Sequence, residues 1–309
     1  MSRTIAIIGS TSAYGSSIVS SLLASSDVAV RAITRDPSSD AARALGSSDR
    51  LSLFQADLDD VESLKKAFEG VQGVYGMTTA NANEVQQGKN LVDAVKAAGV
   101  EHLVLSSLPS IASASSGKYT NVFYFEGKAE IERYAKEHLS NVTIVIPGVR
   151  YEDLARPLYT RRCADGTVRF CMSDKNADPS VGFLDASDVG AFVSSIFSKP
   201  LPLVSGKTYP IMTSSVSAAN FAATYAAKTG DKVVVEPISA DEINAMMAGV
   251  PFGEMIAAAA NDMFEYLDST PAGTTAYGTI KREEDSSFAD LGVKATSLES
   301  WLEKSSWKA

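Results

Sequence analysis

Cysteine and histidine are scarce in this chain of 309 residues, which has only two of each. Cys163 and Cys171 are distant in sequence from His102 and His138, so we expect neither a zinc site nor another metal centre. Two cysteines build no disulfide framework, and this fits a reducing compartment. We therefore expect a cytoplasmic protein without a bound metal.

Long apolar runs and a positive net charge are also missing. No stretch approaches the roughly 20 uninterrupted apolar residues of a membrane span, and the first nine residues do not resemble a signal peptide. The net charge is −9, from 28 lysines and arginines against 37 acidic residues. Because an acidic surface repels DNA and anionic lipid, we expect no membrane and no direct nucleic-acid partner. The expected partner is a small molecule, and an anionic one is compatible with the net charge if a locally basic pocket holds it.

Strand-like and helix-like segments alternate through the first half of the chain. Short β-branched and apolar runs predict strands at 4–8, 28–33, 51–54, 73–77, 101–106 and 142–146. Helical spacing of apolar residues predicts helices at 14–24, 60–68, 84–98 and 123–137. Because parallel neighbours need crossover connections, the pattern predicts an α/β fold with a doubly wound parallel Rossmann sheet. Ligands of such sheets bind at the carboxyl ends of the strands.

Beyond residue 150 the alternation loosens. We divide the chain there, into an NAD(P)-binding domain at 1–150 and a smaller, mostly helical substrate-binding or lid region at 151–309. Helices are predicted at 187–197, 217–228, 240–248, 252–267 and 297–304. Strands are predicted at 181–184 and 207–211, and segments around 181–211 are expected to return to the Rossmann sheet. The serine-rich stretch 111–117 is expected to be mobile.

The motif Gly9-x-x-Ser12-x-x-Gly15 follows the first predicted strand and opens the first predicted helix. Gly9 permits a tight turn, Gly15 allows the helix to pack closely on the strand, and the helix amino terminus presents free N–H groups to a pyrophosphate. Thr11 and Tyr14 are expected beside the same phosphates. Ser12 stands where the motif usually has glycine, and it either crowds the pyrophosphate or donates a hydrogen bond to it. The alternative is a plain strand–turn–helix of small residues.

The second predicted strand ends in Thr34-Arg35-Asp36. An acidic residue at this position binds the ribose 2′-hydroxyl of NAD, whereas an arginine pairs with the 2′-phosphate of NADP. Arg35 follows the strand directly, so we predict NADP rather than NAD, with a solvated Arg-Asp turn as the alternative. Asp57 and Leu58 follow the third strand and are predicted to meet the adenine, although Asp57 alternatively belongs to the cap of the next helix.

Polar residues at the ends of the later strands are expected to line the nicotinamide side. Thr78 and Thr79 end the fourth strand, and the alternative for them is a polar start of a loop. Ser106 and Ser107 end the fifth strand, and strand alternation lets only one of them point toward the site. We take Ser107 as the group that orients a substrate oxygen and Ser106 as a cofactor contact. Pro147, at the end of the sixth strand, is a further expected cofactor contact.

Several segments share the order and spacing of a known family. They are the turn 9–15, Thr34-Arg35-Asp36, Ala56-Asp57-Leu58, 88–90, 99–108, 125–132, Pro147-Gly148, 183–190, 291–294 and 301–302. Together they resemble the NmrA-like family of atypical short-chain dehydrogenases along nearly the whole chain. The resemblance implies a Rossmann fold and a bound nicotinamide dinucleotide. The family includes NADP-dependent reductases, isoflavone-reductase-like enzymes and regulators that bind the dinucleotide and catalyse nothing known. Ser12 departs from its pattern, as does the segment 151–153, where the family often has asparagine.

Tyr124 and Lys128 have the spacing of the tyrosine–lysine pair that dehydrogenases of this superfamily use, one helical turn apart. In such a pair the lysine lowers the pKa of the phenol and holds the nicotinamide ribose, so that the tyrosine can exchange a proton with the substrate. The alternative is that Tyr124 is a core residue, since it stands between Phe123 and Phe125. Tyr119 is a lesser rival as proton donor.

These residues predict an NADP-dependent reductase of a small carbonyl or an activated double bond. Tyr124 supplies the proton, Lys128 tunes it, and a serine at 106 or 107 orients the substrate. A non-catalytic regulator that senses NADP and acts through a protein partner is one alternative. A cofactor-assisted isomerase, lyase or epimerase is another. The presence of Tyr124 favours an enzyme, because the resemblance implies that many regulators of the family lack this tyrosine.

Overall fold

The computed structural model describes residues 3–24 and 27–309, and its centre is a seven-stranded sheet in the order β11-β6-β5-β4-β1-β2-β3. All neighbouring strands in it are parallel. The strands are β1 (Arg3–Ile7), β2 (Val28–Thr34), β3 (Leu51–Gln55), β4 (Gly73–Gly76), β5 (His102–Ser106), β6 (Val142–Pro147) and β11 (Thr208–Ile211). The order reverses beside β1, which is the arrangement of a doubly wound sheet. The predicted Rossmann fold is confirmed.

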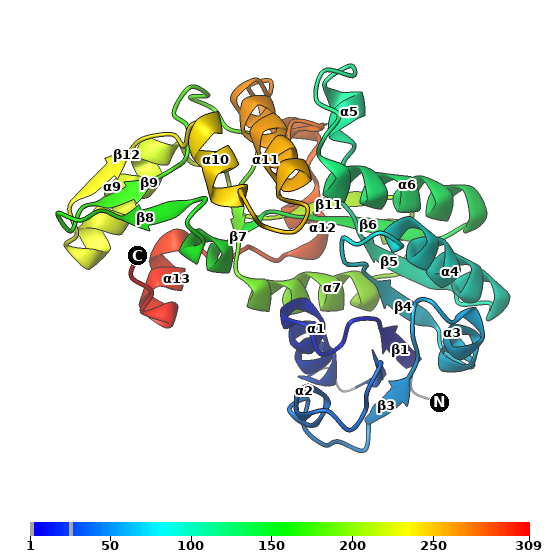
Figure 1. Ribbon diagram of the computed structural model, residues 1–309. Helices are drawn as coiled ribbons and strands as arrows, with labels where there is room; N and C mark the ends of the chain where they lie inside the picture. The colour runs from blue at the N-terminus through cyan, green and yellow to red at the C-terminus, as the bar shows by residue number, and fades with distance from the viewer. Residues whose placement is uncertain (1–2, 25–26) are drawn as a thin grey trace.

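Helices cover both faces of the sheet (Figure 1). Helices α1 (Ala13–Ala24) and α7 (Val189–Ser198) pack together on one face, and α3 (Val61–Phe68), α4 (Glu84–Ala97) and α6 (Phe123–His138) cover the other. The side chains of strand β4 pack alternately against the two layers of helices. Val74 belongs to the α3–α4–α6 core and its neighbour Tyr75 to the α1–α7 core. Successive side chains of a strand point to opposite faces, so a doubly covered strand must be apolar throughout.

Two short helices in the first half were not predicted. Helix α2 (Asp40–Arg43) follows β2, and α5 (Ile111–Ala114) lies in the stretch that was expected to be mobile. Mobility of the whole stretch stays a prediction, and within it the Glu126 carboxylate holds the first turn of α5. It accepts hydrogen bonds from the Ser110 hydroxyl at 2.7 Å and from the Ala112 N–H at 3.0 Å. Serine content alone did not reveal an anchor that comes from the next helix.

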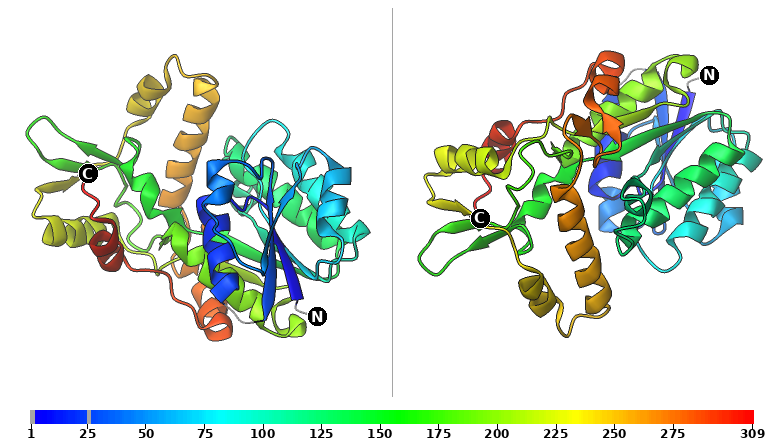
Figure 2. Two further views of the ribbon diagram at one scale, coloured as in Figure 1. Left: turned by 90° about the horizontal axis from the view of Figure 1, so that it is seen from below. Right: turned by 90° about the horizontal axis from the view of Figure 1, so that it is seen from above.

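Much of the second half of the chain, apart from α7 and β11, forms a lobe beside the sheet (Figure 2). The lobe contains the predicted helices α9 (Ala218–Thr229), α10 (Ala240–Met247), α11 (Gly253–Asp268) and α13 (Leu298–Ser305). The short α8 (Leu201–Val204) and α12 (Ser287–Leu291) lie at the central sheet instead, where Val204 and Leu291 join the α1–α7 core. A three-stranded sheet of β8 (Thr160–Arg162), β9 (Val168–Phe170) and β12 (Val233–Val235) was not predicted. Each of these strands has only three residues, too few for a period of two to be recognised in the sequence.

The two strands predicted between residues 181 and 211 have different partners. Strand β11 pairs with β6 at the edge of the central sheet, whereas β10 (Phe183–Leu184) pairs with β7 (Val149–Arg150) in a separate two-stranded sheet. A second two-stranded sheet joins β13 (Thr274–Thr275) to β14 (Ile280–Lys281). The division into domains at residue 150 stays a prediction.

Candidate cofactor and active site

The glycine turn brings the start of α1 directly onto the end of β1. Gly9 has a φ of +68°, in the left-handed region that glycine adopts without strain. A Cβ atom on Gly15 would lie 2.1 Å from the carbonyl oxygen of Gly9. No side chain fits there, so the helix can begin this close to the strand only with glycine at position 15.

Ser12 caps the helix that follows the turn. The Gly15 N–H donates to Ser12 Oγ at 3.1 Å, and Ser12 Oγ donates to Met77 Sδ at 3.6 Å. The serine therefore satisfies one of the free N–H groups of the helix amino terminus, a role that neither sequence expectation included. Within the described residues, the N–H groups of Ala13 and Tyr14 have no acceptor and remain available to an anion.

A cavity of about 820 Å³ lies where β1, β2, β3 and β4 end. Its lining includes these predicted cofactor residues: Gly9, Thr11, Ser12, Arg35, Asp57, Leu58 and Thr79. We call this cavity the adenosine end of the site. Gly15, Tyr14, Thr78, Ser106, Pro147 and Lys128 were predicted as well but do not line it. Residues from four separate turns thus meet in one space of a size suited to a nucleotide.

Arg35 and Asp36 both line the adenosine end, but they differ in the partners that they already have. The Arg35 guanidinium is exposed and has no acidic partner within the described part of the chain. The Asp36 carboxylate accepts from the Ser38 N–H at 2.8 Å and from the Ser38 hydroxyl at 2.6 Å. These hydrogen bonds lower the pKa of Asp36 and keep it ionised. The arginine is free to pair with an added anion, whereas one oxygen of the carboxylate, Oδ1, already accepts two hydrogen bonds from Ser38.

Asp57 and Leu58 form another wall of the adenosine end. Asp57 Oδ1 accepts from the Asp59 N–H at 3.0 Å, and the Leu58 carbonyl accepts from Asn90 Nδ2 at 2.8 Å. Asp60 caps α3 by accepting from the N–H groups of the second and third residues of the helix. Asp57 is therefore not the helix cap, and its turn holds a fixed shape at the cavity wall.

Lys128 lies in a buried polar cluster with Glu84 and Thr78. Lys128 Nζ forms an ion pair with Glu84 Oε1 and donates to the Thr78 carbonyl at 3.0 Å. Thr78 Oγ1 donates to Glu84 Oε1 at 2.7 Å, and the Glu84 side chain is only 5% exposed. Sequence reasoning missed Glu84, because an acidic residue in the first turn of a helix is common for its effect on the helix dipole.

Tyr124 has a raised pKa, which corrects the expectation that Lys128 lowers it. Burial raises the pKa of Tyr124, and the nearby Tyr159 adds to the rise. The ring packs edge-on between Phe123 and Phe125, with centroids 5.5 and 5.2 Å away. The Lys128 ammonium is directed to Glu84 instead of the phenol, so burial dominates.

Ser107 and Pro147 are engaged inside the protein. The Ser107 side chain is 1% exposed, and its hydroxyl donates to the carbonyl of Lys128 at 3.3 Å. The Pro147 carbonyl accepts from the Tyr277 hydroxyl at 3.0 Å. Ser106 is half-buried at the end of β5, and Tyr14 is half-buried against the α1–α7 core. We call Thr78, Ser106, Ser107, Tyr124, Lys128 and Pro147 together the nicotinamide end of the site.

Tyr277 is a residue of this region that sequence reasoning missed. It lies between β13 and β14, where Ala276 and Tyr277 have φ values of +49° and +58°. Left-handed backbone is costly for residues other than glycine, and such strain persists where the surrounding structure holds it. The Tyr277 ring packs edge-on against Phe125 at 4.9 Å, which links this turn to α6. No pattern in the irregular second half marks this tyrosine.

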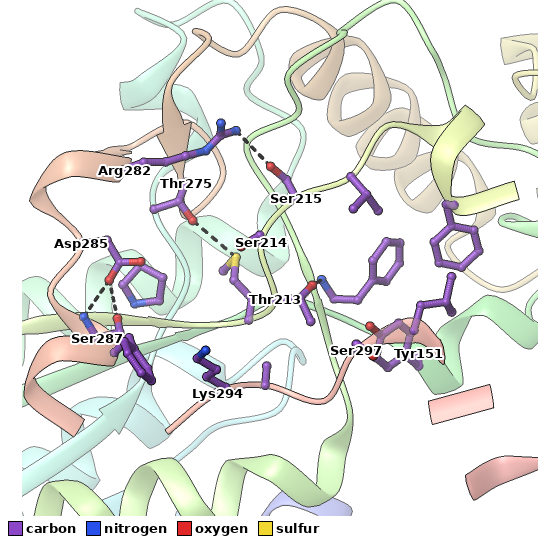
Figure 3. A pocket seen from close by; sticks show the side chains of 18 of the residues that line it. Tyr151, Thr213, Ser214, Ser215, Thr275, Arg282, Asp285, Ser287, Lys294 and Ser297 are labelled. Carbon is purple, nitrogen blue, oxygen red and sulfur yellow. Dashed lines mark hydrogen bonds between the residues drawn. The ribbon is translucent and has the colours of Figure 1, made fainter. Parts of the chain in front are cut away.

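A second large cavity, of about 780 Å³, lies in the second half of the chain (Figure 3). Tyr151, Thr213, Arg282, Asp285 and Lys294 belong to its lining. Arg282 donates to the Ser215 hydroxyl at 2.9 Å, so this arginine is partly engaged. None of the predicted cofactor or catalytic residues lines this cavity.

Across residues 3–24 and 27–309, no helix combines the length and apolarity that a membrane crossing needs. No group of three or more His, Cys, Asp and Glu side chains there is arranged to hold a metal ion.

Comparisons with known proteins agree with this architecture. The sequence pattern of the NmrA-like family matches residues 1–302. The NmrA-like family domain-containing oxidoreductase FrzB of Cladobotryum sp is 36% identical over 146 residues, which are 44% of this chain and 43% of that protein. The oxidoreductase notA of Aspergillus sp. (strain MF297-2) is 29% identical over 271 residues, 77% of this chain and 76% of that one. The match therefore spans less than half of FrzB and about three quarters of notA.

Two solved structures share the fold. NmrA, a negative transcriptional regulator solved in complex with NADP, has a TM-score of 0.75 and 21% identity, over 100% of this chain and 93% of that one. The NADPH-dependent quinone oxidoreductase QOR2 of Escherichia coli has a TM-score of 0.73 and 20% identity, over 98% of this chain and 100% of that one. With a family match over 302 residues and the same architecture throughout, this chain belongs to the NmrA-like family.

Proposed function

We propose that the chain binds NADP at the adenosine end and reduces a small carbonyl or an activated double bond. The observation that carries the cofactor choice is the contrast between Arg35 and Asp36. Arg35 is free beside the cavity, whereas the Asp36 carboxylate is held by Ser38. A guanidinium pairs with a 2′-phosphate, and the Asp36 carboxylate, whose Oδ1 already accepts from Ser38, is in part satisfied before a 2′-hydroxyl arrives.

The phosphate groups would bind at the start of α1. The free N–H groups of Ala13 and Tyr14, together with the positive end of the helix dipole, suit a pyrophosphate. The similarity to proteins described as oxidoreductases, and to structures solved with NADP and NADPH, supports the same assignment. Asp57 and Leu58 would contact the adenine from the opposite wall.

Bound NADPH would supply a hydride, and the chain's own groups would supply and steer the proton. The Tyr124 phenol is protonated at neutral pH and so carries the proton to be donated, while burial, by raising its pKa, makes it a weaker acid than a tyrosine paired with a lysine. Lys128 would contact the nicotinamide ribose from its place beside Glu84 and Thr78. Of the two serines, Ser106 is the better candidate to orient a substrate oxygen, because the Ser107 hydroxyl is buried and bonded to a carbonyl.

The test offers the protein NADPH with a panel of aldehydes, quinones and enones. Oxidation of NADPH is measured as the loss of its nicotinamide absorbance. Tyr124→Phe should lower kcat by about 100-fold and leave NADPH affinity unchanged, as expected for loss of a general acid. Tyr134→Phe is the matched control, since Tyr134 is on the same helix and its hydroxyl donates to Asp93. Because burial raises the pKa of Tyr124, kcat should not fall through ionisation of this phenol below about pH 10.

Two outcomes would contradict the reductase proposal. If no compound of the panel supports turnover and Tyr124→Phe behaves as the parent does, the proposed reduction is wrong. Turnover without net consumption of NADPH would instead indicate an isomerase, lyase or epimerase.

A regulatory role is the second candidate. It is favoured by the pairing of Lys128 with Glu84 and by the similarity in fold to NmrA, a negative transcriptional regulator. Such a protein would bind NADP through the same adenosine end and pass the signal to a protein partner. NADPH binding without turnover, combined with a partner whose affinity depends on NADPH, would support it.

A further inference from the structure

Lys128 and Glu84 form an ion pair that is largely withheld from solvent. The Lys128 side chain is 16% exposed and that of Glu84 is 5% exposed. Thr78 completes the cluster, because its hydroxyl donates to Glu84 Oε1 at 2.7 Å and its carbonyl accepts from Lys128 Nζ at 3.0 Å. Partly buried charges are screened by water and salt much less than surface charges are. The balance of charge in this pair therefore sets the electrostatic potential around it.

The helix that carries Lys128 is shaped to receive the Glu84 carboxylate. Gly127 precedes Lys128 on α6, and a Cβ atom there would lie 3.0 Å from Glu84 Oε2. Gly88 of α4 lies against Ile131 of α6, where a Cβ atom would overlap the isoleucine side chain. Glycine is unfavourable inside a helix, but at these positions it lets α4 and α6 approach closely. The carboxylate thus occupies a built position beside the lysine.

The pair lies at the carboxyl end of β4, which is the edge where a doubly wound sheet binds its ligand. Met77 and Thr79 line the adenosine end. Thr78, between them, accepts from Lys128 Nζ through its carbonyl. The carbonyl of Lys128 in turn accepts from the Ser107 hydroxyl, just beyond β5. The pair is therefore next to the cavity in which the cofactor of the proposed reaction would bind.

Among the residues of the nicotinamide end, Lys128 alone carries a charge. Arg150 is three residues beyond Pro147, and it is matched by Asp153. Its Nε donates to Asp153 Oδ2 at 2.9 Å and its Nη2 to Oδ1 at 2.7 Å. The Glu84 carboxylate cancels the charge of Lys128, and without it the lysine would give this end an uncompensated positive charge.

The two forms of the cofactor differ in charge at one position. The nicotinamide ring is positively charged in NADP⁺ and neutral in NADPH, whereas the adenosine and the phosphates are the same in both. An uncompensated positive charge near the ring repels NADP⁺ and leaves NADPH unaffected at that position. Contacts at the adenosine end cancel in the ratio of the two affinities. This ratio therefore reports the potential at the nicotinamide end.

We infer that the Glu84 carboxylate is the counter-charge that sets the affinity of this site for NADP⁺ relative to NADPH. The inference rests on the proposed function for the cofactor and for its orientation, with the nicotinamide toward Lys128. Glu84 acts through the field of its pair with Lys128, so it is a positioning residue. This role does not depend on hydride transfer, and it applies to a reductase and to a regulator alike.

The test measures the affinities for NADP⁺ and NADPH by calorimetric titration of the full chain at one ionic strength. Glu84→Gln keeps an oxygen for Thr78 and Lys128 and removes the charge. It should weaken NADP⁺ relative to NADPH by about fivefold, as expected for an uncompensated charge in a partly buried site. Glu130→Gln is the matched control, because Glu130 pairs with Lys89 between the same two helices through more exposed side chains. There the ratio should stay within about twofold of the parent ratio.

Two more variants separate charge from structure. Lys128→Met leaves the carboxylate uncompensated, so it should shift the ratio the other way, in favour of NADP⁺, by about fivefold. The double variant Glu84→Gln with Lys128→Met lacks both charges, and its ratio should return to within about twofold of the parent. A merely structural role would leave the double variant at least as altered as each single variant. Thermal melting checks that each variant is folded. Should Glu84→Gln fail to fold, the shift in Lys128→Met decides the inference alone.

The outcomes separate this inference from the proposed function. It is overturned if the single variants leave the ratio unchanged or move it in the same direction. A parent that binds neither form of the cofactor would refute the inference together with the NADP assignment. Opposite shifts in a protein that oxidises NADPH with no compound of the panel would leave the role of Glu84 standing and refute the reductase. NADPH oxidation with unchanged ratios would do the reverse.

Discussion

The two ends of the site differ in what their side chains already contact. At the adenosine end the cavity is open, Arg35 has no acidic partner among the described residues, and two N–H groups of α1 are free. At the nicotinamide end the polar groups are paired with one another. Lys128 is bound to Glu84 and Thr78, and the Pro147 carbonyl is bound by Tyr277.

This difference follows from how the ends are assembled. The adenosine end is made of short runs of consecutive residues, each directly after a strand of the central sheet. Their geometry is set by the turn itself, and the end is ready for a ligand without rearrangement. The nicotinamide end joins distant segments, because Lys128 pairs with Glu84 and the Tyr277 hydroxyl donates to the Pro147 carbonyl. A ligand there has to exchange contacts with the protein, so that end contributes more to stability.

The largest effect is expected from breaking the buried pair at the nicotinamide end. Lys128→Met leaves the Glu84 carboxylate buried with only Thr78 as a donor, and should lower the free energy of unfolding by about 3 kcal/mol. Lys89→Met is the matched control, because Lys89 joins the same two helices through a more exposed pair with Glu130. That variant should lose about 0.5 kcal/mol or less. Urea unfolding measures both, and equal losses would show that the cluster is not a stabilising centre.

A somewhat smaller effect is expected at the glycine turn. In Gly15→Ala the new Cβ would lie 2.1 Å from the Gly9 carbonyl oxygen, so the turn must open. We expect a loss of about 2 kcal/mol in unfolding free energy and of most NADPH affinity. Gly46→Ala is the control, since Gly46 has a φ of +84° with open space around it, and there the cost is backbone strain of about 1 kcal/mol alone. Full NADPH binding by Gly15→Ala would contradict the role of the turn.

The smallest effect concerns the cap at Ser12. Ser12→Gly frees the Gly15 N–H and should cost only a few tenths of a kcal/mol in stability, as glycine is a tolerable helix cap. NADPH affinity should rise by about threefold, because one more N–H faces the phosphates. Weaker NADPH binding in a calorimetric titration would show instead that the Ser12 hydroxyl itself contacts the pyrophosphate.

The sequence allowed the adenosine end to be predicted much better than the nicotinamide end. Gly9 and Gly15 follow β1 and Arg35 follows β2 within a few residues, so their spacing in the sequence already indicates their positions. The position of Lys128 on α6 was also predictable, but its partner Glu84 is 44 residues away and looks like any acid at a helix start. Tyr277 owes its position to a strained turn, for which no periodic pattern exists. The burial of Ser107 against α6 could not be predicted, because strand alternation does not show which face α6 covers.

The most direct test is a calorimetric titration of NADPH and NADH with the parent, Arg35→Ala and Arg43→Ala. Arg43 is the matched control, as it lies close by on α2 and is already paired with Asp40 at 2.5 Å. The parent should prefer NADPH, and Arg35→Ala should weaken NADPH by about 30-fold with NADH affinity unchanged, the effect of losing a charged hydrogen-bonded pair of about 2 kcal/mol. Arg43→Ala should change neither affinity. Equal affinities for NADPH and NADH in the parent, unaltered in Arg35→Ala, would contradict the assignment of the adenosine end to NADP.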